Sequence, residues 1–533
     1  MVRILLQQIR RDRLTLPIWI LGTVALLAVS ATAVATEFGD ADGRRTVLSL
    51  ALATPALLAL RGIPNGDSLG STVHFQSFAF LAVTIGLMNT FLATRHGRAD
   101  EEKGRRELVA ATPAFRLSPP IATLLLGLIA NGLFVVVAKA GYEAAGLDAS
   151  GALLSAVALG VTGLAFLGIS MLAGELTATS RGANGIGVVV VLASYAFRAA
   201  GDALGTPDIA KLTLQPAWPS WLSPIGWGQQ TLAFTDDNWA PVAWIAVLAV
   251  VTATVALIVH SRRELGASLL PERAGRATAR AALRSPFALA WWLQSSALLA
   301  WTVGSALLGV ALGSLVTAIS GSDLGDTPAV AQILQSLGHT QGDLGRALIP
   351  ALMTMVGVLA AAAGVQAVLR MRDEESDGRA ETVLTTPHSR AVWLLSFTAV
   401  GAASVVVVLL ATGLAAVAGF AALGEADDGW LSLGQGLAQG PAALTFVGLA
   451  AVLMALLPRA AVALSWGIFA VGVGIGLFGG LLGLDDDVQK ISPFANVPAL
   501  PSDDWVPTIL IGAIALVLGA IAALLFRRRD LVT

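Results

Sequence analysis

Long apolar stretches alternate with short polar segments along almost the whole chain. Each stretch holds about 20 residues, the length that a helix needs to cross a hydrocarbon core of roughly 30 Å. The pattern predicts twelve membrane-spanning helices, at residues 15–36, 75–94, 117–142, 151–174, 183–200, 240–260, 293–318, 348–369, 391–421, 440–457, 461–483 and 506–526. We therefore expect an all-α polytopic membrane protein.

The first apolar stretch also has features of a secretory signal. Arg10, Arg11 and Arg13 precede it, and residues 31–35 have the small side chains of a cleavage site. The stretch is nevertheless long enough to span, and its Trp19-Ile20-Leu21-Gly22 has a counterpart in residues 301–304. We therefore interpret it as the first span.

A basic stretch separates the sixth predicted span from the seventh. It is too polar to cross a membrane, because it contains Arg262, Arg263, Arg273, Arg276, Arg280 and Arg284. We predict a first six-span half at 1–262, a cytoplasmic basic linker with an amphipathic segment at 263–290, and a second six-span half at 291–533.

The basic residues favour one side of the predicted spans, and Lys and Arg are enriched in cytoplasmic loops. The basic side comprises residues 10–13, 95–106, 181, 261–290, 370–390, 459 and 527–529. The opposite loops are more acidic, at 208–237, 323–343 and 485–504, although Arg44, Arg45 and Arg61 are exceptions. We expect a multi-pass protein of the cytoplasmic membrane with both termini in the cytoplasm.

One polar segment occurs twice. Residues 98–116 and 372–390 align without gaps at an offset of 274 and are identical at nine of nineteen positions. Both copies follow the second span of their half. Six spans per half give the two copies the same orientation, so the pattern predicts two parallel six-helix repeats rather than inverted ones. The two halves share weaker similarities at Ser223-Pro224 and Ser492-Pro493, and at residues 262–265 and 528–531.

The repeated segments 98–116 and 372–390 could be solvated turns, which is the ordinary interpretation of a charge run. Their shared Gly, Glu and Thr-Pro favour a surface that fits a partner twice. We predict a short helix at roughly 99–109 and 373–383, supported by Glu101–Arg105 and Glu375–Arg379 pairs four residues apart. The Thr-Pro pairs would end these helices.

Residues 101–107 with Thr112-Pro113, and 374–381 with Thr386-Pro387, resemble the coupling helices of type-2 ABC exporter permeases. The resemblance is to the long fused actinobacterial forms associated with export of polyketide antibiotics such as tetronasin and with multidrug efflux. In that family the coupling helix docks in a groove of the ATPase subunit and transmits its motion. The resemblance extends to the span count and to the outer Ser-Pro, but only the repeated segments are residue-specific.

The resemblance implies two sets of coupling residues. They are Asp100, Glu101, Glu102, Gly104, Arg105, Glu107, Thr112 and Pro113 in the first copy, and Glu374, Glu375, Gly378, Arg379, Glu381, Thr386 and Pro387 in the second. The second copy departs from the first in having Thr382 where the first has Leu108. Two ATPase subunits need not dock equally well on the two copies.

The chain itself has no recognisable site for ATP. A P-loop needs a glycine-rich turn followed by Lys and then Ser or Thr. None of Lys103, Lys139, Lys211 and Lys490 follows Gly or precedes Ser or Thr. We therefore expect a non-enzymatic permease with no cofactor of its own, partnered by two copies of a separate ABC ATPase that bind ATP and Mg.

The predicted spans carry almost no charge, which favours a path for a hydrophobic or amphipathic small molecule. The candidate lining residues are Phe75, Gln76, Asn89, Phe91, Asn131 and Gln366. The polar members of this set could equally hydrogen-bond between helices, as such residues commonly do in membranes.

Two other classes of protein are alternatives. A proton-driven carrier of the major facilitator type also has two parallel six-span halves, but Glu101 and Glu102 replace the Asp-Arg pair of its loop motif. A membrane-embedded enzyme would need ionisable groups at membrane depth. Lys139, Glu175, Arg198 and His260 lie near span ends, where such side chains commonly reach toward the interface.

The composition excludes further classes. The chain is 56% hydrophobic and only 13% charged, whereas a soluble domain carries roughly 25% charged residues. Its net charge of -2 gives no indication of nucleic-acid binding. With no cysteine it has neither disulfides nor thiolate metal sites, and its five histidines show no metal-ligand spacing.

Overall fold

The computed structural model describes residues 1–270, 278, 283, 285–320, 344–479, 484–527 and 529. It divides into two compact units, Met1–Gly275 and Arg276–Thr533, called unit 1 and unit 2 below. Several sequence predictions fall outside the described residues. They are the linker arginines Arg273, Arg276, Arg280 and Arg284, the acidic loop 323–343, the end of the eleventh predicted span at 480–483, and Arg528.

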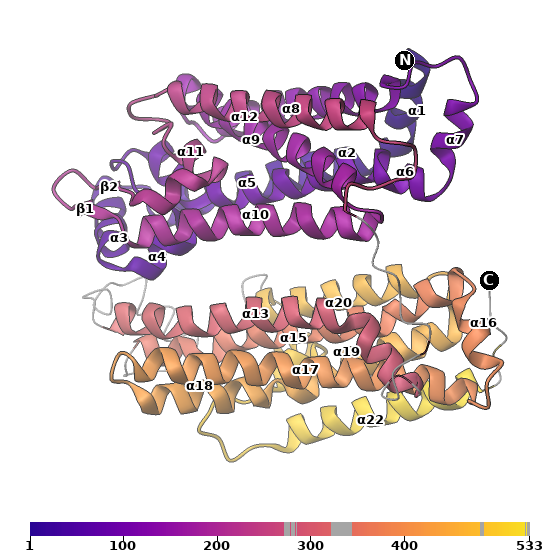
Figure 1. The fold of residues 1–533 in the computed structure, drawn as a ribbon. Helices are drawn as coiled ribbons and strands as arrows, with labels where there is room; N and C mark the ends of the chain where they lie inside the picture. Colours follow the sequence, from indigo (N-terminus) through magenta and orange to yellow (C-terminus); the bar gives the residue numbers. More distant parts are fainter. Residues whose placement is uncertain are drawn as a thin grey trace. The chain divides into compact units, whose positions relative to one another are not determined.

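Unit 1 is a bundle of six long helices that run lengthwise through it (Figure 1). They are α2 (Thr15–Glu37), α5 (Leu69–His96), α8 (Ser118–Ala144), α9 (Ala149–Leu176), α10 (Ser180–Ala203) and α12 (Ala240–Arg262). α9 is the central helix, because it packs against α5, α8, α10 and α12. A core of interlocking small and aromatic side chains, including Phe78, Phe134 and Phe166, fills the space between them.

Short elements gather at the two ends of unit 1 (Figure 1). At one end lie α1 (Val2–Asp12), α6 (Arg98–Glu102) and α7 (Arg105–Ala110). At the other end lie α3 (Ala41–Ala53), α4 (Pro55–Arg61), the antiparallel hairpin of β1 (Thr206–Asp208) and β2 (Thr213–Gln215), η1 (Trp218–Leu222) and α11 (Pro224–Gln229). The segment between the fifth and sixth predicted spans, residues 201–239, is therefore a folded cap. Ser223 begins α11 by accepting hydrogen bonds from the Ile225 and Gly226 amides.

Unit 2 repeats the order of long helices. They are α13 (Pro286–Ser320), α15 (Leu344–Ser376), α17 (Arg390–Ala421), α18 (Ala426–Ala438) followed by α19 (Gly440–Leu456), α20 (Ala461–Phe478) and α22 (Val506–Phe526). The shorter elements are α16 (Arg379–Leu384), α21 (Asp486–Gln489) and η4 (Pro493–Asn496). α19 packs against α15, α17 and α22, which are the counterparts in chain order of α5, α8 and α12 around α9.

Eleven helices of the described residues are long and apolar enough to cross a membrane. They coincide with eleven of the twelve predicted spans, so the chain is an all-α polytopic membrane protein. The remaining prediction, 461–483, corresponds to the shorter apolar helix Ala461–Leu477, and residues 480–483 of that prediction lie outside the described part. The twelve-span arrangement and the boundaries of the two halves and the linker stay predictions.

Three of the four charged residues near span ends do not reach toward the interface as predicted. Arg198 is fully buried, pairs with Asp202 at 3.2 Å and stacks on the Tyr195 ring. Glu175 and His260 lie in a buried cluster described below. Burial is tolerated at these three positions because each side chain has a hydrogen-bonding or ionic partner. Lys139 is partly exposed and pairs with Glu143 on its own helix.

Candidate functional site

A glycine interrupts each repeated segment. In the first copy α6 ends at Glu102, Gly104 takes the left-handed conformation with φ +68°, and α7 starts at Arg105. In the second copy α15 continues to Ser376, Gly378 has φ +72°, and α16 follows. The prediction of one short helix per copy is therefore wrong, because a left-handed residue ends helical hydrogen bonding and glycine adopts that conformation without strain.

The predicted pairs four residues apart are also wrong, because the arginine after each glycine turns to a different acid. Arg105 Nη1 lies 3.1 Å from Asp100 Oδ1, and Arg379 Nε lies 2.6 Å from Glu374 Oε2. Asp100 and Glu374 occupy matching positions of the repeat. In both copies, therefore, an ion pair connects the acid before the glycine to the arginine after it. The two ionic hydrogen bonds of Glu374 raise the pKa of Arg379.

The shared glutamates are buried inside the protein. Glu101 is bound by Arg263 at 2.8 Å and by Arg98 at 2.7 Å, and its side chain is 3% exposed. Glu375 is bound by Arg529 at 2.8 Å, with Arg372 at 3.8 Å, and its side chain is 1% exposed. Both glutamates therefore anchor the repeated segment within its own unit.

The anchoring arginines occupy equivalent places. Arg263 follows α12 and Arg529 follows α22, each unit's last long helix. The backbone carbonyls of Arg263 and Arg529 also accept hydrogen bonds from Arg116 and Arg390, which end the two repeated segments. Each repeated segment is thus tied twice to the end of the last helix of its unit.

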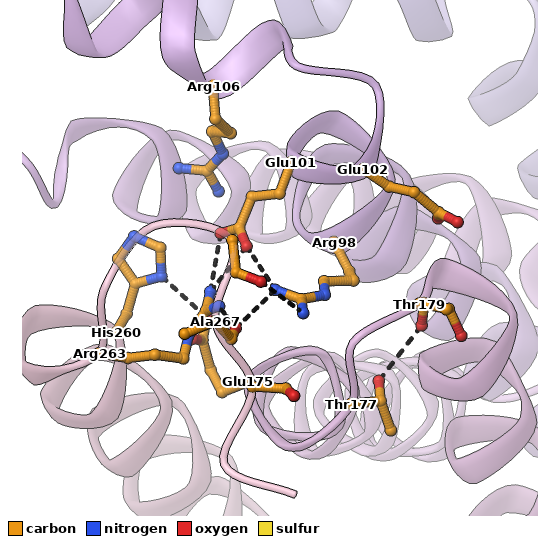
Figure 2. Close-up of polar contacts among 12 residues, drawn as sticks. Arg98, Glu101, Glu102, Arg106, Glu175, Thr177, Thr179, His260, Arg263 and Ala267 are labelled. Atoms are coloured by element: carbon orange, nitrogen blue, oxygen red, sulfur yellow. Dashed lines mark hydrogen bonds and ion pairs between the residues drawn. The ribbon is translucent and has the colours of Figure 1, made fainter. Parts of the chain in front are cut away.

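Unit 1 has an additional acid at this junction. Figure 2 shows Arg263 between Glu101 and Glu175, with Glu175 Oε2 accepting from Arg263 Nε at 2.6 Å and Oε1 lying 2.8 Å from His260 Nδ1. In unit 2 the matching arginine instead donates to the Met454 carbonyl at 2.6 Å and stacks on Phe526. Sequence reasoning missed this junction, although the Arg-Arg-acid-Leu echo at 262–265 and 528–531 was its signal.

The amphipathic helix α1 joins the first repeated segment from the N-terminal side. Arg11 pairs with Asp100 at 2.8 Å, and Asp12 pairs with Arg95 and with His96 Nε2, the latter at 2.7 Å. Burial alone would raise the pKa of Asp12, but the hydrogen bonds and charges of His96 and Arg95 hold that pKa below its ordinary value. α1 is therefore bound to this end of the bundle.

The remaining predicted coupling residues lie mostly on the surface. Glu107, Thr112 and Pro113 are exposed, as are their counterparts Glu381, Thr386 and Pro387. Glu102 is also exposed and accepts a hydrogen bond from the Ser180 amide at the start of α10. Beside Glu107 lies Leu108, which is 74% exposed, and the matching Thr382 is exposed too. The exposed residues of the two copies therefore occupy matching positions of the repeat.

The predicted path residues separate into two groups. Gln76 lines a cavity of about 750 Å³ between α2, α4, α5 and α10, where it accepts a hydrogen bond from Arg61. Gln366 lines a smaller cavity of about 300 Å³ between α13 and α15, where it accepts from Trp301. These two glutamines lie on the second long helix of their units.

The other predicted path residues lie between helices. Asn89 and Asn131 donate to each other at 3.1 and 2.8 Å and are at most 2% exposed. Phe75 is buried in a cluster with α3 and α4, and Phe91 packs against Trp19 at a ring distance of 6.0 Å. Among the described residues, no group of three or more His, Asp or Glu side chains is placed to hold a metal ion.

The fold and these segments define a multi-pass helical membrane protein with two matched loop structures. The chain belongs to the family of multidrug efflux system permeases. It is 33% identical over 532 residues to multidrug efflux system permease protein Rv1217c of Mycobacterium tuberculosis, a match that covers 98% of this chain and 93% of that protein. The family model described as Multidrug efflux system permease Rv1217c, C-terminal domain, matches residues 283–527. The chain is therefore a transmembrane permease of the efflux type.

Proposed function

We propose that this chain is the permease subunit of an ATP-driven ABC exporter of hydrophobic or amphipathic compounds. In this proposal all twelve apolar stretches span the cytoplasmic membrane as two parallel six-helix repeats, and both termini are cytoplasmic. Two copies of a separate ATPase subunit, which hold ATP and Mg, dock on the two repeated segments. The similarity to a multidrug efflux system permease does not favour the secondary-carrier alternative.

The observation that carries the proposal is the shared anchoring of the two repeated segments. Glu101 with Arg263, and Glu375 with Arg529, join each segment to the last long helix of its unit through buried ion pairs. A force on the exposed side of the segment would therefore reach a membrane-spanning helix rather than being absorbed by a loose turn. Two such connections suit a pair of ATPase subunits acting together.

The name of the relative supports drugs as cargo, and the unit 1 cavity supports an apolar compound. The cavity is lined mainly by aliphatic and aromatic side chains such as Leu26, Val29 and Phe80. ATP binding would close the ATPase subunits, move both repeated segments and favour one of two arrangements of the long helices. Coupling of this kind requires an energetic difference between the two arrangements.

The docking surface is tested by placing a charge on its exposed apolar residue. We expect Leu108→Glu, combined with Thr382→Glu, to abolish co-purification of the candidate ATPase subunit and drug-stimulated ATP hydrolysis. Loss of a central interface contact costs about 2 kcal/mol or more, which corresponds to roughly a 30-fold weaker complex. The measurement is the ratio of ATPase to permease after purification in detergent.

A matched control is Leu204→Glu, because Leu204 is 70% exposed at the end of α10 opposite the repeated segments. This variant should co-purify with the ATPase as the unmodified chain does. Unchanged ATPase association in the Leu108/Thr382 double variant, or proton-driven transport by the permease alone, would overturn the proposal.

A further inference from the structure

A second cavity of unit 1 lies beside the first repeated segment and has no part in the proposed coupling. Its volume is about 380 Å³. It is enclosed by α7, by the loop that leads into α8, by the first turn of α8 and by the last turn of α12 with the residues after it. Its charged or titratable lining residues are Arg106, Arg116, His260 and Glu264, and the other lining side chains are apolar.

Arg106 is a buried arginine that lines this cavity. It is 6% exposed, and its Nη2 donates to the His96 carbonyl at 3.3 Å. Its Nε is buried without a hydrogen-bond partner among the described residues. Burial lowers the pKa of Arg106, against the opposing effect of nearby carboxylates, and an arginine stays charged even so. A buried guanidinium with an unused donor is costly unless an anion accepts from it.

The carboxylates near Arg106 are already engaged by other groups. Glu101 is bound by Arg98 and Arg263, and Glu175 is bound by Arg263 and His260. Figure 2 shows the Arg106 guanidinium apart from these pairs, with no dashed line to them. Among the described residues Arg106 therefore has no carboxylate within ion-pair distance, although Asp100, Glu101 and Glu175 lie near it.

The second half of the chain does not repeat this feature. The position of Arg106 is taken by Ala380, and Phe526 stands three residues before Arg529 as His260 stands three residues before Arg263. The bridges that shape the repeated segment are present in both units, so Arg106 is not needed to form that segment. A separate role confined to unit 1 accounts for it.

The cavity lies where two membrane-spanning helices end. Pro119 belongs to the first turn of α8 and His260 to the last turn of α12. Phe115, 68% exposed, and Leu265, 45% exposed, extend its apolar surface. Lipid phosphates lie at the depth of span ends, and basic pockets beside spans on the cytoplasmic side bind anionic headgroups.

We propose that this cavity binds the headgroup of an anionic phospholipid, with Arg106 and Arg116 donating to its phosphate and Phe115 and Leu265 lying against its acyl chains. The proposal rests on the cytoplasmic placement of this end of unit 1 in the proposed function. Glu264 at the cavity accepts hydrogen bonds but repels a bare phosphate. A headgroup that carries both a phosphate and hydroxyl donors, as phosphatidylglycerol does, therefore suits this lining best.

The test is native mass spectrometry of the full chain, with and without its ATPase partner, titrated with short-chain phosphatidylglycerol. The matched probes are phosphatidylcholine of the same chain length and inorganic phosphate. We expect saturable binding of phosphatidylglycerol alone. Arg106→Ala, which introduces the residue of the second half, should weaken it roughly tenfold or more, because a hydrogen bond to a charged group contributes about 1.5–3 kcal/mol.

Arg262→Ala is the control, because Arg262 is a basic residue at the same end of unit 1 that is exposed and does not line the cavity. It should bind phosphatidylglycerol as the unmodified chain does. If Arg106→Ala does not purify as a folded protein, Arg116→Gln decides the matter and should weaken binding roughly threefold or more.

Three results would overturn the lipid site. They are equal binding of phosphatidylcholine, competition by inorganic phosphate at similar concentration, and phosphatidylglycerol binding that is unchanged in the Arg106 and Arg116 variants. Displacement of the lipid by the ATPase, with a cross-link from the ATPase into the cavity, would also overturn it by identifying a protein occupant. Arg106-dependent lipid binding by a chain that captures no ATPase would instead sink the proposed function and leave the lipid site standing.

Discussion

Arg263 follows the last turn of α12 and reaches carboxylates from two other parts of the chain. Its Nη2 binds Glu101, its Nε binds Glu175, and it is 8% exposed. Breaking a buried ion pair by removing one partner leaves the other charge without compensation, which costs more than the pair itself contributes. Arg263 therefore stabilises the folded junction, and in the proposed function it would also pass force through it.

Replacing Arg263 with Ala should lower the thermal stability of the purified chain. The expected loss is about 3 kcal/mol, because Glu101 and Glu175 stay buried without that partner. For a unit of this size the loss corresponds to a decrease in Tm of roughly 6–12 °C. The measurement is thermal unfolding in detergent, followed by intrinsic tryptophan fluorescence.

The neighbouring Arg262 is exposed and serves as the comparison. Arg262→Ala should leave Tm within about 1 °C, since surface substitutions change stability little. A Tm decrease of equal size in both variants would show that the ion pairs of Arg263 do not set the stability of this end of the bundle.

Three helices of unit 1 meet at a polar contact in the middle of the bundle. Asn89 of α5 and Asn131 of α8 hydrogen-bond to each other, and Gly163 of α9 faces them. A Cβ at Gly163 would lie 2.4 Å from Asn131 Oδ1 and 2.6 Å from Asn89 Nδ2. The asparagine pair therefore fits between the helices only because the third helix has no side chain there. This packing favours the interhelical role of Asn89 and Asn131.

We expect Gly163→Ala to destabilise unit 1 by about 1–3 kcal/mol, because the added methyl group must displace the asparagine pair. Gly185→Ala is the matched change in α10, where an added Cβ meets nothing within 4 Å. That variant should be neutral or slightly stabilising, since alanine is the better helix former. Thermal unfolding of both variants measures the difference, and a stable Gly163→Ala would contradict the close packing of the three helices.

At the scale of the whole molecule, the two units agree in their long helices and differ in their cavities. The pairs α2–α5 and α13–α15 pack alike in chain order. The unit 1 cavity nevertheless measures about 750 Å³ and the unit 2 cavity about 300 Å³. The larger space is the better candidate for the compound in the proposed export function, since drug-sized ligands occupy pockets of about 300–1,000 Å³.

Filling this cavity should block transport while leaving the complex assembled. Ala33 of α2 lines the cavity, and Ala33→Trp adds a large ring there. We expect drug-stimulated ATP hydrolysis to fall at least about tenfold, with the ATPase still co-purifying, because the indole ring would occupy space that the compound needs. A tenfold decrease corresponds to about 1.4 kcal/mol of lost binding free energy.

Ala28→Trp makes the same change on an exposed part of α2 that does not line the cavity. This control should retain drug-stimulated hydrolysis. Full stimulation in Ala33→Trp would show that the compound passes elsewhere, and loss of ATPase association in that variant would point to a folding defect instead.

The sequence by itself determined the class of this protein. An apolar stretch of this length in a bilayer forms a helix, because its backbone N–H and C=O groups must hydrogen-bond within the stretch. Length and composition alone therefore predicted the long helices that the described residues contain. The repeat at an offset of 274 residues also identified the two segments that share a left-handed glycine and a short helix after it. The difference between the two copies at Leu108 and Thr382 was also evident from the sequence, because it is a difference in residue type and does not depend on which groups the residues contact.

Only the tertiary structure decided which groups the repeated residues contact. Glycine was expected within a helix, but Gly104 and Gly378 take left-handed conformations that local charge patterns do not reveal. Glu101 was expected to face a partner, yet Arg263, 162 residues away in sequence, buries it. Ion pairs between distant segments depend on how helices pack, and a sequence pattern records only neighbours along the chain. For the same reason, only the structure shows that Arg106 is buried without a carboxylate partner among the described residues.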